Sequence, residues 1–212
     1  MRHGESTWNL EGRYQGRMDP PLSGRGQAQA QALADRLATE QKSEPAERRL
    51  TSIVSSPLAR ACETARYCAT ALDLDLRLDD HLTEISHGEW EGLVRGEVAS
   101  RWPEMLAQWR TSPYLVRFPG GEMLEEVELR LLSFLNEMRS ATGATLAVTH
   151  DVIVRIAILR ATGKDLSAFN DVGVDNAAIT EFETSGTALT LTSRNDAKHL
   201  GSLRSDTRAQ AL

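Results

Sequence analysis

The segment "TSIVSSPLARACETARYCATAL" (residues 51–72) joins an apolar, β-branched run to a stretch with helical periodicity. The run at residues 51–56 is bounded by polar residues and predicts a short buried strand. Pro57 follows directly and suits the first turn of a helix. One stripe of that helix is apolar and comprises Leu58, Ala61, Cys62, Ala65, Cys68, Ala69 and Leu72. A buried strand that leads into an amphipathic helix is typical of α/β proteins.

The same succession recurs along the chain. Residues 144–150 ("ATLAVTH") predict a second buried strand, and the helix after it is expected to begin at Asp151 and end at Gly163. A helix over residues 23–40 has Ser23 as its expected N-cap, and another is expected over residues 120–141. Their inward faces comprise Ala30, Leu33, Ala34 and Leu37 in the first, and Leu124, Val127, Leu131, Phe134 and Met138 in the second.

Shorter patterns complete the fold prediction. Residues 74–78 predict a strand, and residues 176–193 predict two strands joined by a turn at Ser185 and Gly186. Alternating strands and helices predict an α/β fold, a three-layer α/β/α sandwich whose mostly parallel central sheet is covered on both faces. Sites in such sheets form at the carboxyl ends of strands. Arg60 and His150 follow two predicted strand ends, and Arg2-His3-Gly4 would be a third such position if a strand preceded it.

Composition limits the class of protein. The 212 residues are 41% hydrophobic and 25% charged, which predicts one soluble domain over residues 1–212, with residues 197–212 as a candidate flexible tail. The net charge of -6 opposes a general nucleic-acid-binding or anionic-membrane surface. The longest apolar run is broken by Arg155 and is too short to span a bilayer, and the N-terminus shows no signal peptide. We therefore expect a cytoplasmic enzyme or binding protein.

The sequence predicts neither a disulfide nor a metal centre. Cys62 and Cys68 fall in one predicted helix, where they are poorly placed to bridge each other. We interpret both as buried small apolar residues in a reducing compartment. No spacing of cysteine and histidine indicates zinc, and no cluster of carboxylates indicates magnesium. No metal and no other cofactor is expected.

The residue types at the expected strand ends suit chemistry on phosphate. Guanidinium groups such as those of Arg2 and Arg60 match the planar geometry of phosphate oxygens, and His150 adds a further donor. His3 is a candidate nucleophile, and Glu84, in "LTEISHGEWEG", is a candidate proton donor. Arginines, histidines and one carboxylate in loops favour phosphoryl transfer through histidine. Spacing alone does not show that these groups meet in space.

Several motifs in order extend this interpretation to a family. They read "RHGESTWN", "GRYQGRMDPPLSGRGQAQA", "SSPLARACETA", "EISHGEWEGL", "PGGEMLEEVELRLLSFL" and "VTHDVIVR". With these motifs the sequence resembles the histidine phosphatase superfamily, whose members have a phosphoglycerate-mutase-like fold. The resemblance extends to about Asp196, and motifs in register are a far stronger signal than an isolated RHG.

The resemblance implies a role for each matching position. His3 is the nucleophile that becomes phosphohistidine, and Glu84 gives a proton to the leaving oxygen. The implied phosphate pocket is formed by Arg2, Arg60 and His150, and the residues implied to line it or to contact substrate are Asn9, Gln15 and Gly16. The last three also suit a purely structural role, Asn9 and Gln15 as turn residues and Gly16 in a tight bend.

Other conspicuous residues match no catalytic position of the family. We interpret His81 and His87 as loop residues. Trp8 and Trp90 could wall the pocket or belong to the core, and we favour the core. His199 matches a C-terminal family feature whose role the sequence does not define.

The sequence departs from the family pattern at its start. Family members carry an apolar strand before RHG, whereas only Met1 precedes Arg2 here. A missing central strand would expose neighbouring strand edges and leave His3 loosely held. We therefore expect that the first few residues of the protein are lacking from this sequence; a truly shortened, poorly active chain is the alternative.

These residues together predict hydrolysis of a small phosphomonoester through a phosphohistidine intermediate. A phosphoglycerate mutase of the same fold is one alternative, although the segment after Glu84 is shorter than the insertion that mutases carry. A non-catalytic phospho-ligand-binding protein is the other. Residues 84–121 are expected to set specificity, and sugar phosphates, phosphoglycerates and cobalamin-precursor phosphates are all candidates. The partner is a small phosphate ester, with no nucleic acid and no membrane; the oligomeric state, a homodimer included, is not readable from the sequence.

Overall fold

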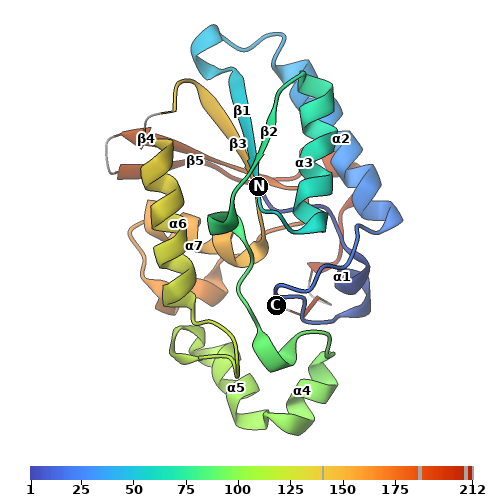
Figure 1. Ribbon diagram of the computed structural model, residues 1–212, viewed down its shortest axis with the longest axis vertical. Coiled ribbons are helices and arrows are strands. Elements are labelled where there is room, and N and C mark those ends of the chain that lie inside the picture. The colour runs from blue at the N-terminus through green and yellow to red at the C-terminus, as the bar shows by residue number, and fades with distance from the viewer. Residues whose placement is uncertain (140, 186–187, 208–209, 212) are drawn as a thin grey trace.

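Parallel strands form the central sheet. The computed structural model describes residues 1–139, 141–185, 188–207 and 210–211 (Figure 1). Strand β1 (Leu50–Ser55) lies between β2 (Leu76–Leu78) and β3 (Ala144–Val148), and all three run parallel. The predicted strands are confirmed, although β2 begins at Leu76 rather than at Leu74. The N–H of Leu74 donates instead to the carbonyl of Ala69, which terminates the preceding helix.

Helices cover both faces of this sheet, because successive strand side chains point in opposite directions. Ile53 packs in one apolar cluster with helices α2 (Gly24–Glu40) and α3 (Ala59–Leu72). Its neighbour Val54 packs in the other cluster, with α6 (Leu124–Met138) and α7 (Asp151–Ala161). In Figure 1, α2 and α3 lie on one side of the strands and α6 and α7 on the other. The predicted α/β fold is confirmed.

The ends of two helices test the capping predictions. The hydroxyl of Ser23 accepts a hydrogen bond from the N–H of Gly26 and caps α2, as predicted. Helix α3 begins at Ala59, so the placement of Pro57 in its first turn is wrong. The N–H of Ala59 donates to Oδ1 of Asp19 at 2.6 Å, and this distant carboxylate supplies the cap that local sequence lacks.

The segment from Glu84 to Gly121 is more ordered than a loop. It contains α4 (Arg95–Arg101) and α5 (Pro103–Thr111), and its aromatic rings pack in a cluster, with Phe118 at 5.0 Å from Trp90 and 4.8 Å from Trp109 between centroids. Trp90 is fully buried, which confirms its core assignment. The same expectation is wrong for Trp8, which lies on the short helix α1 (Thr7–Glu11) and is only partly buried. The 3-10 helices are Ala46–Arg48, Asp80–Leu82, Gly88–Trp90, Pro113–Leu115, Leu166–Asp171 and Lys198–Leu203.

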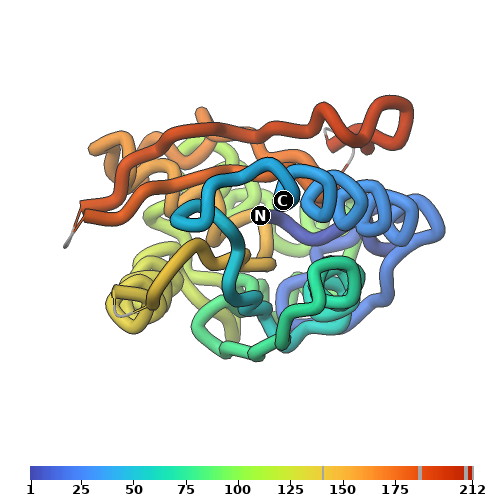
Figure 2. The backbone as a smooth tube through the Cα atoms, turned by 90° about the horizontal axis from the view of Figure 1, so that it is seen from above, coloured from blue at the N-terminus to red at the C-terminus, as the bar shows by residue number. Residues whose placement is uncertain are grey.

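An antiparallel hairpin follows the last long helix. Strands β4 (Ile179–Ser185) and β5 (Ala188–Asp196) pair with each other as a separate sheet, which confirms the two predicted strands. Figure 2 shows this hairpin, in red, running along one side of the molecule. Gly186 of the predicted turn lies outside the described residues. Among the residues that are described, no helix is both long enough and apolar enough to cross a membrane.

Candidate active site

The first residues of the chain lie alongside β3. The amino group of Met1 donates to the carbonyl of Ala147 at 2.7 Å, and the N–H of Thr149 donates to the carbonyl of Met1 at 2.9 Å. The N–H of His3 then donates to the carbonyl of Thr149 at 2.9 Å. His3 therefore lies beyond the carboxyl end of β3, at the sheet edge where the sequence predicts a site.

His3 is firmly held by its neighbours. Its ring is buried, with 2% of the residue exposed. Nδ1 lies 2.6 Å from the carbonyl of Gly4, and Nε2 accepts a hydrogen bond from Nε of Arg60 at 3.2 Å. Because a carbonyl only accepts, these partners assign the proton to Nδ1 and a lone pair to Nε2. Burial lowers the pKa of His3 well below its ordinary value, and the charges of Arg60 and Arg2 lower it further, so the ring is neutral.

Arg60 lies in the first turn of α3 and spans the space between His3 and the loop after α1. Its Nη1 donates to the carbonyl of Met18 and its Nη2 to the carbonyl of Gly16, both at 2.8 Å. Burial lowers the pKa of Arg60 to about 10, which leaves the guanidinium charged at neutral pH. A fixed positive charge thus lies directly beside the imidazole lone pair.

Arg2 supplies a second buried guanidinium. Its Nη1 donates to the carbonyl of Val174 at 2.8 Å and lies 3.4 Å from Oδ1 of Asp151. Burial lowers the pKa of Arg2, and the carboxylate of Asp151 opposes that effect. Among the described residues, Nε of Arg2 has no hydrogen-bond partner. One donor of this guanidinium is therefore left for another molecule.

His150 approaches His3 from the start of α7. The two ring centroids are 5.1 Å apart, and Nε2 of His150 lies 2.7 Å from the hydroxyl of Ser56. Nδ1 of His150 is buried and has no hydrogen-bond partner in the described part of the chain. Burial lowers the pKa of His150 well below its ordinary value, with Arg60 as the next cause, so this ring is also neutral.

Glu84 follows the 3-10 helix Asp80–Leu82 and is 5% exposed. Its Oε1 accepts a hydrogen bond from the N–H of Ile85 at 2.9 Å. Burial raises the pKa of Glu84 to about 7, and the charge of Asp151 acts in the same direction, against the opposing charges of Arg60 and Arg2. A carboxyl group that is partly protonated at neutral pH has the property that a general acid needs.

The residues implied to line the pocket are partly structural. Oδ1 of Asn9 accepts from the N–H of Ser6 at 3.0 Å and completes a capping box of α1, while the carboxamide oxygen of Gln15 accepts from the hydroxyl of Ser6 at 2.7 Å. Gly16 has a φ of +50°, and a Cβ there would lie 2.1 Å from Oε1 of Glu91. Gly16 therefore fits a tight bend whose carbonyl orients Arg60.

A glutamine near the end of the chain, which no sequence pattern predicts as a site residue, reaches the same site. Oε1 of Gln210 accepts from Nη2 of Arg2 and from Nδ2 of Asn9, and its Nε2 donates to Oδ1 of Asn176 at 2.8 Å. Nδ2 of Asn176 in turn donates to the carbonyl of His3 at 3.3 Å. Gln210 is 3% exposed, so this part of the region 197–212 packs against the site.

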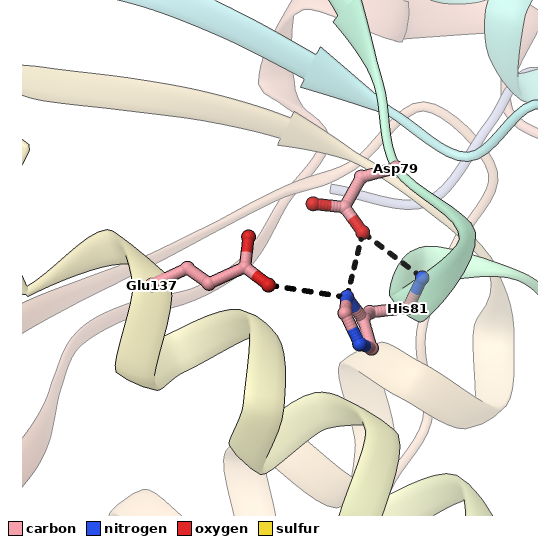
Figure 3. Close-up of side chains that lie close together, drawn as sticks. All are labelled: Asp79, His81 and Glu137. Atoms are coloured by element: carbon pink, nitrogen blue, oxygen red, sulfur yellow. Dashed lines mark hydrogen bonds and ion pairs between the residues drawn. The ribbon is translucent and has the colours of Figure 1, made fainter.

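The remaining histidines lie outside this set of contacts. Figure 3 shows His81 between Asp79 and Glu137, with its Nδ1 at 2.9 Å from Oδ1 of Asp79 and 3.6 Å from Oε1 of Glu137. These groups lie close enough to share a cation, but Arg77 already pairs with both carboxylates, at 3.0 and 3.8 Å. His87 is buried, and burial lowers its pKa to about 3.

The fold of this chain is similar to the folds of known proteins. The fold matches solved structures of phosphatases, among them a mycobacterial glucosyl-3-phosphoglycerate phosphatase with a TM-score of 0.82 and 26% identity, covering 92% of this chain and 96% of that one. YhfR of Bacillus stearothermophilus gives a TM-score of 0.85 at 28% identity, covering 94% and 96% of the two chains. These matches place the chain in the phosphoglycerate-mutase-like α/β class.

Within that class, the chain belongs to the histidine phosphatase superfamily (branch 1), whose family model matches residues 1–197. Phosphoserine phosphatase 1 of Hydrogenobacter thermophilus is 41% identical over 180 residues, which cover 84% of this chain and 82% of that relative. The resemblance inferred from the motifs is therefore confirmed. The protein is a phosphatase, a hydrolase that acts on phosphate monoesters.

Proposed function

We propose that this phosphatase hydrolyses L-phosphoserine, or a phosphomonoester of similar size, through a phosphohistidine formed on His3. The identity to phosphoserine phosphatase 1 supports the substrate. The intermediate is supported chiefly by the 3.2 Å contact between Nε of Arg60 and Nε2 of His3, because it directs the imidazole lone pair toward a cation that attracts phosphate. Free cysteines buried in α3, Cys62 and Cys68, support a reducing, cytoplasmic location.

In the first step, Nε2 of His3 attacks phosphorus and the P–O bond to the alcohol breaks. The carboxyl group of Glu84 gives its proton to the departing alkoxide and becomes a carboxylate. The positive charge that develops on the imidazole is balanced by the transferred phosphoryl group. The carbonyl of Gly4 keeps the ring oriented, because it accepts from Nδ1 at 2.6 Å.

In the second step, the carboxylate of Glu84 takes a proton from water as the water oxygen attacks phosphorus. The P–N bond breaks, inorganic phosphate leaves, and His3 returns to its neutral form. Each proton that Glu84 gives is thereby regained, and the cycle needs no redox partner.

Binding of the phosphoryl oxygens is assigned to Arg2, Arg60 and His150. Arg2 contributes Nε, a buried donor without a partner among the described residues. The hydroxyl of Ser56 accepts from the N–H of Leu58 and can give its own proton to Nε2 of His150, which leaves the other ring proton on Nδ1, facing away from Ser56. These donors stabilise the charge that spreads over the phosphoryl oxygens in the transition state.

A panel of phosphomonoesters tests the substrate, with release of inorganic phosphate as the measurement. L-phosphoserine is expected to give the highest kcat/KM, above 3-phosphoglycerate, sugar phosphates and p-nitrophenyl phosphate. A clear preference for another ester would replace phosphoserine while keeping the reaction. Isomerisation of 3-phosphoglycerate in the presence of bisphosphoglycerate, with little free phosphate, would contradict hydrolysis as the main activity.

Catalysis is expected to need no metal, because buried guanidinium groups supply the positive charge that a metal would otherwise provide. Dialysis against a strong chelator should leave kcat/KM unchanged, and vanadate should inhibit, since it adopts the five-coordinate geometry of a transferring phosphoryl group. The variant Glu137→Gln, which removes one carboxylate of the cluster in Figure 3, should also keep its kcat/KM unchanged. Activity that is lost on chelation and restored by a divalent cation would contradict this proposal.

A further inference from the structure

The turn that carries Glu84 is held from one side by an arginine of α6. Nη1 of Arg130 donates to the carbonyl of His81 at 3.0 Å and to the carbonyl of Thr83 at 2.9 Å. Its Nη2 lies 3.5 Å from the carbonyl of Glu84 itself. A rigid guanidinium that binds successive carbonyls fixes the path of the backbone just before Glu84.

Glu122, just ahead of α6, holds the same turn on the other side of Glu84. Its Oε2 accepts from the N–H of Ser86 at 2.8 Å, and its own N–H donates to the carbonyl of Ser86 at 2.9 Å. Close packing adds to these bonds, since a Cβ on Gly121 would lie 2.4 Å from the carbonyl of Ser86. The backbone on the C-terminal side of Glu84 is therefore fixed as well.

Arg130 and Glu122 also bind each other. Both carboxylate oxygens of Glu122 accept from the guanidinium of Arg130, at 3.2 Å each, in the bidentate geometry that makes such pairs strong. The side chains are only 20% and 17% exposed, so solvent screens this pair less than a surface pair. Oε1 of Glu122 accepts in addition from Arg17, the neighbour of Gly16, at 2.8 Å.

We propose that Arg130 and Glu122 form a clamp that positions Glu84 for proton transfer to the leaving group. The inference rests on the role proposed above for Glu84. Every clamp contact near Glu84 is made to backbone atoms of residues 81–86, and the carboxyl oxygens of Glu84 are left free of both side chains. The clamp therefore sets where the acid lies, and a small displacement of a catalytic group costs large factors in rate.

The variant Arg130→Gln tests the clamp, and Arg130→Lys and Glu122→Gln test it with smaller changes. The rate of phosphoenzyme formation in a single turnover is measured with L-phosphoserine and with p-nitrophenyl phosphate, each normalised to the fraction of enzyme that becomes labelled. Arg130→Gln should slow the reaction of phosphoserine by roughly 10–100-fold, because an alkoxide needs a well-placed acid. The reaction of p-nitrophenyl phosphate, whose leaving group is stable without a proton, should change by less than about threefold.

Arg130→Lys should recover part of the loss, since an ammonium group can bind carbonyls but not both oxygens of Glu122. Arg160→Gln is the matched control: it breaks an ion pair of similar length, 2.8 Å, between α7 and Glu128 of α6, and should leave both rates unchanged. In a Glu84→Gln background, Arg130→Gln should add almost nothing to the loss with phosphoserine.

Two results would overturn the clamp. Equal losses on both substrates in Arg130→Gln, or full additivity with Glu84→Gln, would show that the pair supports the fold alone. If Glu84→Gln slowed both substrates equally, Glu84 would not be the general acid. That result would contradict the role proposed for Glu84 rather than the contacts of the clamp.

Discussion

Replacement of His3 by alanine is expected to lower the turnover of every phosphomonoester by at least roughly 10⁴-fold, because it removes the nucleophile. The other imidazole of the site does not replace it. His150 lies 5.1 Å from His3 between ring centroids, and its unprotonated nitrogen, Nε2, faces the hydroxyl of Ser56, whereas the nitrogen assigned to the phosphate, Nδ1, carries the ring proton. The buried arginines remain in His3→Ala, so the variant should still bind inorganic phosphate.

The measurement is the covalent intermediate itself. Enzyme mixed with ³²P-labelled substrate and denatured in alkali should retain label on the protein, and mild acid should release it, as expected of a phosphohistidine. His3→Ala should retain none. His81→Gln provides the control, because His81 binds Asp79 and Glu137 and lies outside the contacts of His3. Label or turnover that persists in His3→Ala would show that the nucleophile lies elsewhere.

The strand and helix units of the core could be predicted because their signals are local. β1 with α3 and β3 with α7 each place an apolar strand next to a helix; one stripe of α3 is buried, and α7 is buried over most of its surface. Parallel pairing then carries Arg60 and His150 to one edge of the sheet without further information. His3 follows the same logic, because residues 1–3 hydrogen-bond to Ala147 and Thr149 at the end of β3.

Contacts between distant segments carry no such local signal. Gln210 reaches Arg2 across almost the whole chain, and nothing in the residues around Gln210 marks that contact. The cap of α3 is equally distant, since Asp19 supplies it and Pro57 does not. Glu122 and Arg130 show the same limit, because one is an ordinary charged residue just ahead of α6 and the other an ordinary charged residue within it until the fold brings the Glu84 turn against them.

Glu84→Gln should slow formation of the phosphoenzyme from L-phosphoserine by roughly 10²–10⁴-fold, the usual worth of general acid catalysis. Glutamine keeps the shape of the side chain but has no acidic proton to give. The same variant should slow the reaction of p-nitrophenyl phosphate far less, since p-nitrophenolate leaves without protonation. Single-turnover rates are required, because hydrolysis of the phosphohistidine also uses Glu84 and would hide the contrast at steady state.

The pH dependence gives an independent test with a definite sign. A general acid works in its protonated form, so the rate with phosphoserine should fall as pH rises through the pKa of Glu84, which burial raises to about 7. A bound phosphate dianion repels the carboxylate and shifts the fall to higher pH. The rate with p-nitrophenyl phosphate should lack this fall, and Glu84→Gln should abolish it for phosphoserine.

The neighbouring carboxylates decide whether this assignment is specific to Glu84. Oε1 of Glu91 already accepts from the N–H groups of Arg17 and His87 and from the hydroxyl of Ser86, so this carboxylate is engaged in holding the surrounding loops. Glu89 is exposed and lies in the same segment, so Glu89→Gln is the matched control and should keep both rates. Leaving-group selectivity that appears in Glu89→Gln and not in Glu84→Gln would move the acid to Glu89. Equal losses for both substrates in Glu84→Gln would mean that Glu84 only positions the phosphate.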